Sequence, residues 1–211
     1  MKDSRKYLEI VSHYEACLAR HGDNHLGVDW PNRADAEKRY QIMLEILADD
    51  SRSPVSLLDF GCGASHLYEY IRARKLEDRI LYSGLDLSAE FIALSQRKFP
   101  ECDFYRVDLL VEDPDVPEFD YVVMNGVFTE KRGLMFNEMW EYFQAVLRRA
   151  SGKARTGIAF NLMSKQVDWE REDLFHVPFD ILARFLTAEI SRHFVIRHDY
   201  RLYEYTAYVY K

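Results

Sequence analysis

From residue 55 onward, short apolar runs alternate with amphipathic segments, and this alternation limits the fold more than any other feature. Strands are predicted at 55–60, 80–85, 102–107, 119–124 and 156–162, and helices at 65–74, 89–98, 134–149 and 178–188. Strands connected through helices of this length form a parallel sheet with helices on both faces. We therefore predict an α/β fold built on a doubly wound, Rossmann-like sheet.

The C-terminal segment departs from this alternation. Two further strands are predicted at 193–198 and 203–210, joined by a few polar residues and no helix. So short a connection allows only antiparallel pairing. The sheet is expected to have seven strands, mostly parallel, with an antiparallel C-terminal hairpin strand.

The first fifty residues are helical in pattern rather than alternating. Apolar side chains recur at three- and four-residue steps from Tyr7 to Leu18, ahead of Gly22, and 21–31 is polar and loop-like. A second helix is expected from about residue 34, with a buried stripe of Tyr40, Met43, Leu44 and Leu47. We expect 1–50 to form a helical cap, or lid, over one globular domain at 51–211.

The amino-acid composition limits which binding partners and which cellular compartment we expect. Among 211 residues, 35 acidic and 28 basic side chains leave a net charge of −7, which disfavours binding to a phosphate backbone. The 3 cysteines suit a reducing compartment, the N-terminus lacks the apolar run of a signal peptide, and no run is long enough to cross a bilayer. We expect a cytoplasmic monomer or homodimer without nucleic-acid or membrane partners.

The residues that carry chemistry stand where the predicted strands end, because ligands of doubly wound sheets bind beyond those ends. The first strand ends in Asp59-Phe60-Gly61-Cys62-Gly63-Ala64-Ser65, whose glycines permit a tight turn and close approach of a ligand. A dinucleotide fingerprint would need glycine at position 66, where His66 stands, and Asp59 would repel a pyrophosphate. A cationic ligand without phosphate, such as S-adenosylmethionine, suits this loop better.

The next strands also end in acidic or amide residues. Asp86 is placed to accept hydrogen bonds from ribose hydroxyls, and Asp108 from an adenine amino group with Leu109 against the ring. Asn125 and Gly126 would line the methionine end of such a ligand. Any one of these acids could equally form a turn, but an acid at each of three strand ends favours ligand binding.

These segments resemble the motifs of class I S-adenosylmethionine-dependent methyltransferases. The resemblance rests on 57–63, 84–88, 107–109 and 119–123, and its motifs cover about 55–162. It implies S-adenosyl-L-methionine as cofactor and S-adenosyl-L-homocysteine as product. The implied binding residues are Asp59, Phe60, Gly61, Cys62, Gly63, Ser65, Asp86, Leu87, Asp108, Leu109, Asn125 and Gly126.

The same resemblance implies individual roles. The turn of Gly61 and Gly63 would pass beneath the cofactor, and Asp59 would bind its amino group, directly or through water. Ser65 stands where the family often has a third glycine, and its hydroxyl would be near the cofactor's carboxylate.

The catalytic residue is open, because a sulfonium methyl needs alignment with its acceptor more than chemical activation. A base is required only where the nucleophile arrives protonated. The candidates are His176, His25 and Trp30, each with an equally ordinary structural explanation, and no metal site is expected.

The acceptor is expected to be a small molecule that receives an O- or N-methyl group. The segment Asn125-Gly126-Val127-Phe128 lacks the prolines typical of enzymes that methylate bases. Asn161, Ser164 and Asp168 after the fifth strand, and the loop around Trp30, are candidate acceptor contacts. The alternatives are a non-catalytic cofactor-binding protein, an enzyme with a protein acceptor, and an NAD-dependent oxidoreductase.

Overall fold

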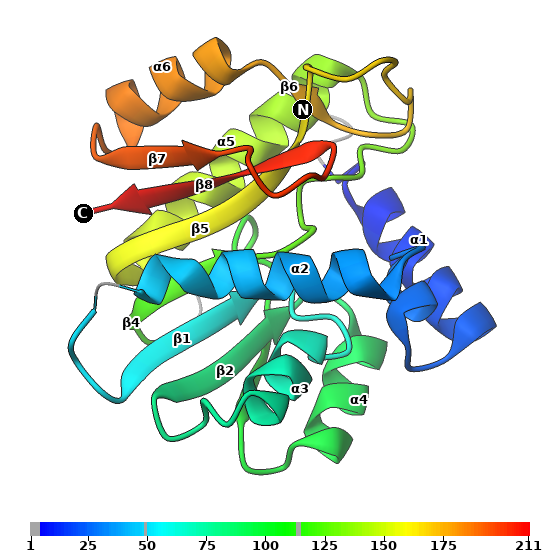
Figure 1. Cartoon of the computed structure of the whole chain (residues 1–211). Helices are drawn as coiled ribbons and strands as arrows, with labels where there is room; N and C mark the ends of the chain where they lie inside the picture. Colours follow the sequence, from blue (N-terminus) through cyan, green and yellow to red (C-terminus); the bar gives the residue numbers. More distant parts are fainter. Residues whose placement is uncertain (1–4, 49, 113–114) are drawn as a thin grey trace.

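A computed structural model describes residues 5–48, 50–112 and 115–211. Its strands are β1 (Val55–Phe60), β2 (Ile80–Asp86), β3 (Asp103–Arg106), β4 (Phe119–Met124), β5 (Ala154–Ser164), β6 (His176–Val177), β7 (Phe194–Arg197) and β8 (Glu204–Tyr210). They form one mixed sheet in the order β3-β2-β1-β4-β5-β8-β7, with β6 paired to β5 (Figure 1). The predicted α/β fold is confirmed.

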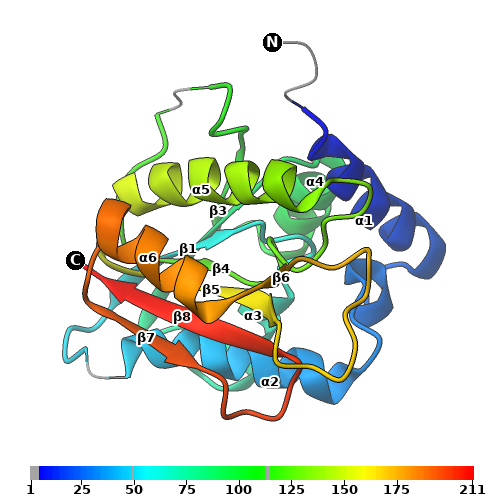
Figure 2. The same ribbon diagram turned by 90° about the horizontal axis from the view of Figure 1, so that it is seen from above.

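The helices cover both faces of this sheet. They are α1 (Leu8–His21), η1 (His25–Val28), α2 (Arg33–Leu44), η2 (Glu45–Leu47), α3 (His66–Ala73), α4 (Ala89–Lys98), α5 (Phe136–Gly152) and α6 (Phe179–Glu189). Figure 2 shows α5 and α6 on one face and α2 and α3 on the other.

Side-chain alternation along the central strands supplies both halves of the core. Leu58 and Val122 lie in the cluster that packs against α5 and α6. Leu57 and Val123 lie in the cluster that packs against α2 and α3. Because successive side chains of a strand point to opposite faces, a strand covered on both sides needs apolar residues on both of its faces.

The strand order reverses beside β1, and this reversal positions the site. From β1 the chain proceeds outward through β2 to β3, and then returns to place β4 on the other side of β1. Asp59 is in parallel register with Gly84 on β2 and Val123 on β4. The carboxyl ends of all three strands therefore meet at one edge, at the switch point where such sheets bind ligands.

The C-terminal hairpin is antiparallel, as predicted. β8 lies between β5 and β7 and is antiparallel to both (Figure 1). The sheet has one strand more than the seven expected, because two residues of β6 pair with the end of β5. A strand of two residues is too short to show a periodic pattern in the sequence. It exists only because its backbone pairs with β5 in the folded structure.

Most element boundaries lie within three residues of the predicted ones, and two differences concern residues near the predicted site. β5 begins at Ala154 and continues through Ser164, so both Asn161 and Ser164, expected as acceptor contacts after the strand, belong to the strand itself. The loop at 21–31 contains η1, whose first turn is capped by the side chain of Asn24. Within the described residues, no helix combines the length and apolarity that a bilayer crossing needs.

Candidate functional site

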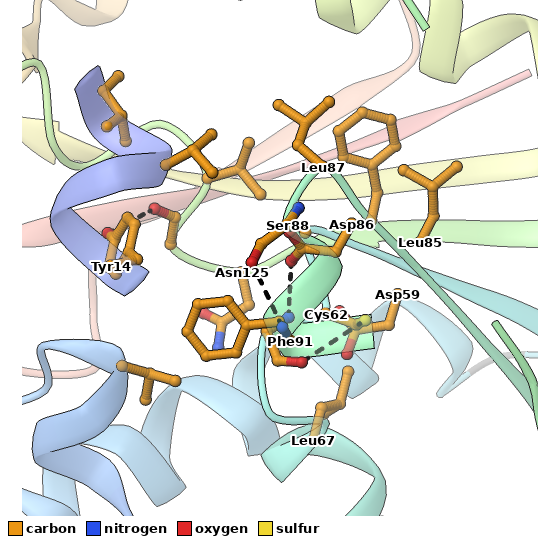
Figure 3. Close-up of a pocket in the computed structure, with 18 of the residues that line it drawn as sticks. Tyr14, Asp59, Cys62, Leu67, Leu85, Asp86, Leu87, Ser88, Phe91 and Asn125 are labelled. Atoms are coloured by element: carbon orange, nitrogen blue, oxygen red, sulfur yellow. Dashed lines mark hydrogen bonds between the residues drawn. The ribbon is translucent and has the colours of Figure 1, made fainter. Parts of the chain in front are cut away.

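A cavity opens at the carboxyl ends of β1, β2 and β4, beneath α1 (Figure 3). It encloses about 960 Å³ including the part open to solvent, which lies within the range of about 300–1,000 Å³ typical of small-molecule sites. Figure 3 shows Asp59, Asp86 and Asn125 around it, with Tyr14 approaching from α1.

Asp86 holds the glycine turn in place. Its Oδ2 accepts a 2.9 Å hydrogen bond from the backbone N–H of Gly63, and its Oδ1 accepts a 2.8 Å bond from Ser88 N–H. Gly63 has a φ of 51°, a conformation that glycine adopts without strain. Burial raises the pKa of Asp86, opposed by these backbone donors. Because a carboxylate offers about four acceptor positions, it can still receive ligand hydroxyls.

Asp59 is the second acid of the cavity. Its carboxyl is only 3% exposed and accepts a 2.8 Å hydrogen bond from the Tyr82 hydroxyl. Burial raises its pKa to about 7, with the nearby charge of Asp86 adding to the shift. A cationic group in the cavity would lower the pKa of Asp59 again, since an opposite charge favours the ionised carboxylate.

The electrostatic character of the cavity is acidic. Asp59 and Asp86 are its carboxylates, and no lysine or arginine belongs to its lining in the described part of the chain. Its one histidine, His66, is engaged by Asp23 at 2.8 Å. A cavity of this composition favours a cationic ligand over a phosphate.

The loop after β4 presents an unused acceptor. Asn125 lines the cavity, and its Oδ1 is buried without a hydrogen-bond partner. A buried polar atom of this kind costs free energy unless a ligand or a water satisfies it. The next residue, Gly126, donates its N–H to Asn161 Oδ1 at 2.8 Å.

Residues of the N-terminal segment form the opposite wall. Tyr7, just before α1, and Tyr14 on α1 contribute rings, and Trp30, which follows η1, lies against Gly126. Two hydrogen bonds of 2.6 Å attach α1 to the acidic loops, from Tyr7 Oη to Asp108 Oδ2 and from Ser88 Oγ to Glu15 Oε1.

Comparison of the sequence with known proteins matches this chain to methyltransferases. The family model described as a methyltransferase domain matches residues 58–155, the part that contains the end of β1, the glycine turn and the acidic strand ends. A Mycobacterium tuberculosis protein, Rv1506c, is named as a methyltransferase and is 28% identical over 170 residues, covering 77% of this chain and 96% of the relative. The family model, the relative and the solved structures together support a class I S-adenosylmethionine-dependent methyltransferase.

Solved structures share the fold of this methyltransferase. Magnesium protoporphyrin IX methyltransferase from Synechocystis, solved with bound S-adenosylmethionine, aligns with a TM-score of 0.66 at 14% identity, over 100% of this chain and 98% of its own. The plantazolicin methyltransferase BamL, solved with a triazolic desmethylPZN analogue and S-adenosylhomocysteine, aligns with a TM-score of 0.65 at 13% identity, over 98% of this chain and 99% of its own.

Most of the predicted cofactor residues line the cavity of the methyltransferase. They are Asp59, Phe60, Gly61, Cys62, Gly63, Asp86, Leu87, Asn125 and Gly126. Three others lie beside it. Ser65 is fully buried with its hydroxyl bonded to Ser95 at 2.8 Å, and Leu109 packs in the core. Asp108 accepts hydrogen bonds from Tyr7 and from the backbone N–H of Leu110.

The three catalytic candidates have different surroundings. His176 is buried, with Nδ1 2.6 Å from Ser164 O and Nε2 accepting from Arg171 N–H at 3.3 Å, so both ring nitrogens serve the β5–β6 connection. His25 Nδ1 lies 2.6 Å from the backbone oxygen of Trp30 and positions that segment. Of the three, only Trp30 belongs to the cavity lining of the described residues.

The acceptor residues expected after β5 are not gathered at the cavity. Asn161 is fully buried inside β5, where it bonds to Gly126 and, at 2.9 Å, to Glu204. The Ser164 hydroxyl accepts from Gln166 N–H, and Asp168 is exposed on the following loop.

The sequence did not identify several of the aromatic residues that line the cavity as ligand contacts. Tyr14 and Tyr40 were placed on the buried faces of their helices, and those faces turn out to include the cavity. Phe91 of α4 and Tyr142 of α5 carried no signal that separates a cavity wall from core. Helical spacing tells which side is buried, but not whether a ligand or protein covers it.

Proposed function

We propose that this methyltransferase binds S-adenosylmethionine in the acidic cavity and transfers its methyl group to a small-molecule acceptor. The observation that carries the proposal is the position of the buried Asp59 and the partly buried Asp86 in a cavity whose described lining contains no lysine or arginine. An ammonium and a sulfonium on the ligand would supply the missing positive charge.

The side chains present fit the cofactor at each strand end. Asp86 would accept from the ribose hydroxyls with the acceptor positions that Gly63 and Ser88 leave open. Asp59 would bind the amino group, and the unpartnered Asn125 Oδ1 would accept a further donor at the methionine end. An adenine amino group at Asp108 would compete with the Tyr7 hydroxyl, which couples the position of α1 to binding.

When bound, S-adenosylmethionine supplies a methyl group on a positively charged sulfur. The chain contributes alignment of the acceptor and exclusion of water, through the rings of Tyr14 and Trp30 on the wall opposite the strand ends. Burial raises the pKa of the Tyr14 phenol far above its ordinary value, so its hydroxyl stays protonated at neutral pH. Tyr14 can therefore donate a hydrogen bond to an acceptor but does not remove its proton.

The small-molecule acceptor is supported by the volume of the cavity and by the aromatic side chains in its lining. The matched magnesium protoporphyrin IX methyltransferase, of similar length and fold, is named for a small organic substrate. Methyl transfer to oxygen or nitrogen is the expected chemistry.

Isothermal titration with S-adenosylhomocysteine tests the cofactor site. Asp86→Ala should weaken binding by about 1–3 kcal/mol, the cost of losing charge-assisted hydrogen bonds. Asp103→Ala is the matched control, because Asp103 is an exposed acid on the neighbouring β3. Equal affinities of the wild type and the folded Asp86→Ala variant would overturn the assignment.

Labelled S-adenosylmethionine tests the acceptor class. The enzyme is incubated with a protein-free metabolite fraction and, separately, with a metabolite-free protein fraction. Label in a metabolite supports the proposal, whereas label confined to protein contradicts a small-molecule acceptor. Binding of the cofactor without label transfer in either fraction identifies a non-catalytic protein.

A further inference from the structure

Three side chains of different chemistry converge outside the cavity wall. His13 and Cys17 lie four residues apart on α1, on one face of the helix, and Asp29 follows η1. One ligand-type atom from each residue lies within 4.8 Å of the other two. None of the three belongs to the cavity lining in the described residues.

The Asp29 carboxylate and the Cys17 sulfur both approach the same imidazole nitrogen. His13 Nε2 is 2.7 Å from Asp29 Oδ2 and 3.7 Å from Cys17 Sγ. One ring nitrogen carries at most one proton, so it serves only one of these groups fully. A metal ion at the point where the three atoms meet would satisfy all of them at once.

The geometry suits a tetrahedral divalent ion. Bonds of about 2.0–2.3 Å to nitrogen, oxygen and sulfur place ligand atoms about 3.3–3.6 Å apart. The Sγ–Nε2 distance is already close to this, and the Asp29 side chain, 39% exposed, has room to rotate away from His13. A thiolate, an imidazole and a carboxylate together favour zinc over magnesium or calcium.

The charges around the cluster allow a cation. The Cys17 thiolate and the Asp29 carboxylate would balance the two positive charges of the ion. Glu130 and Arg132, the charged neighbours from the segment after β4, pair with each other at 3.3 Å. Arg20 is a further cation on α1 that acts on the Cys17 thiol.

A second cluster of similar composition is already filled by a side chain. Asp23, His66 and Glu69 also converge, but the Lys98 ammonium lies 2.8 Å from Asp23 and 2.7 Å from Glu69. That lysine supplies the positive charge that a metal would bring. Of the two clusters, the one formed by His13, Cys17 and Asp29 is therefore the better candidate for a metal site.

We propose that His13, Cys17 and Asp29 bind a zinc-type divalent ion that fastens α1 to η1. On binding, the Cys17 S–H bond breaks, a metal–sulfur bond forms, and the proton passes to solvent. Three protein ligands leave the fourth position to water. Because Tyr14 and Trp30 are the chain neighbours of His13 and Asp29, the ion would hold both cavity-wall side chains in place, a consequence that rests on the proposed function.

Cobalt(II) titration of the full-length protein tests the site without any cofactor. One equivalent should produce a thiolate-to-cobalt absorption band, and zinc should displace the cobalt. Cys17→Ser should abolish the band, and Cys102→Ser, which removes a cysteine outside the cluster between α4 and β3, should leave it unchanged. Asp29→Asn and His13→Ala should weaken zinc binding by at least about 10–100-fold, the loss seen even for outer partners of metal ligands.

Hydrogen exchange supplies an independent measurement. Zinc should slow amide exchange in residues 8–30 of the wild type but not of Cys17→Ser, with circular dichroism confirming that both are folded. Absence of the cobalt band in the wild type, or its persistence in Cys17→Ser, would overturn the metal site. Because neither measurement uses S-adenosylmethionine, failure of the cofactor assignment would leave this result intact, and the reverse also holds.

Discussion

Asn161 accepts a 2.8 Å hydrogen bond from the backbone N–H of Gly126, which joins the middle of β5 to the loop that ends β4. The other end of the same amide donates at 2.9 Å to Glu204 Oε1 on β8. Glu204 also accepts from Arg39 of α2 at 2.8 Å, and the Arg39 guanidinium lies 4.1 Å from the centre of the Trp30 ring. A continuous set of buried contacts thus connects the C-terminal hairpin to the cavity wall.

Asn161→Ala should destabilise the protein by about 1–3 kcal/mol, because it leaves the buried Gly126 N–H and the Glu204 carboxylate short of a partner. Urea unfolding measures the change. Asn161→Asp should cost more, since it places a second carboxylate against Glu204. Asn137→Ala on the exposed face of α5 is the control and should stay within about 0.5 kcal/mol of the wild type. Equal effects of the Asn161→Ala and Asn137→Ala variants would contradict the role given to Asn161.

Gly126→Ala adds only one methyl group but should disturb the cavity wall. Gly126 has a φ of 82°, and an added Cβ would lie 2.7 Å from Cζ2 of Trp30. The strain should cost more than about 1 kcal/mol of stability and displace the indole. Gly152→Ala is the control, because a Cβ there meets nothing within 4 Å. Titration with S-adenosylhomocysteine should show weaker binding for Gly126→Ala alone.

Trp30→Ala should weaken cofactor binding more than folding. The indole covers Gly126 at the methionine end, so its loss should cost about 1–2 kcal/mol of binding to S-adenosylhomocysteine through lost apolar contact. Trp30→Phe should recover part of that affinity because it keeps a ring beneath Arg39. Calorimetry and thermal unfolding are measured on the same samples. A large fall in Tm with unchanged affinity would show instead that Trp30 anchors the N-terminal segment.

Asp59 should make stability fall as the pH rises. Burial raises its folded-state pKa to about 7 from an unfolded value near 4, so between these values the folded state holds a proton that the unfolded state has lost. In that window its contribution declines by up to about 1.4 kcal/mol per pH unit, and it levels off above the folded pKa. Asp59→Asn removes the decline. The measurement is the difference in unfolding free energy between wild type and variant across pH 4–8.

Cofactor affinity should show the opposite trend. A ligand ammonium favours the ionised form of Asp59, so S-adenosylmethionine should bind the wild type more tightly as the pH approaches 7, by up to about tenfold per unit. Asp59→Asn should show a flatter dependence, and Asp103→Asn, an exposed acid, should follow the wild type. Parallel slopes for wild type and Asp59→Asn would separate Asp59 from the amino group.

The sequence alone determined the sheet and the acidic strand ends. The runs 55–60 and 119–124 are mostly apolar on both faces and coincide with β1 and β4, since a strand covered on both sides of a sheet packs mainly apolar side chains. Asp59 and Asp86 could be placed at one edge because the carboxyl ends of parallel strands meet there. These are local patterns combined with one topological rule.

Only the tertiary structure decided what lies opposite those acids. The contact of Tyr7 with Asp108 spans 101 positions, and that of Asn161 with Glu204 spans 43, so no periodicity could reveal either pair. Asp29 meets His13 because η1 turns the chain back along α1. Side-chain convergence of this kind depends on how separate elements pack, and each element's own sequence records only which of its faces is buried.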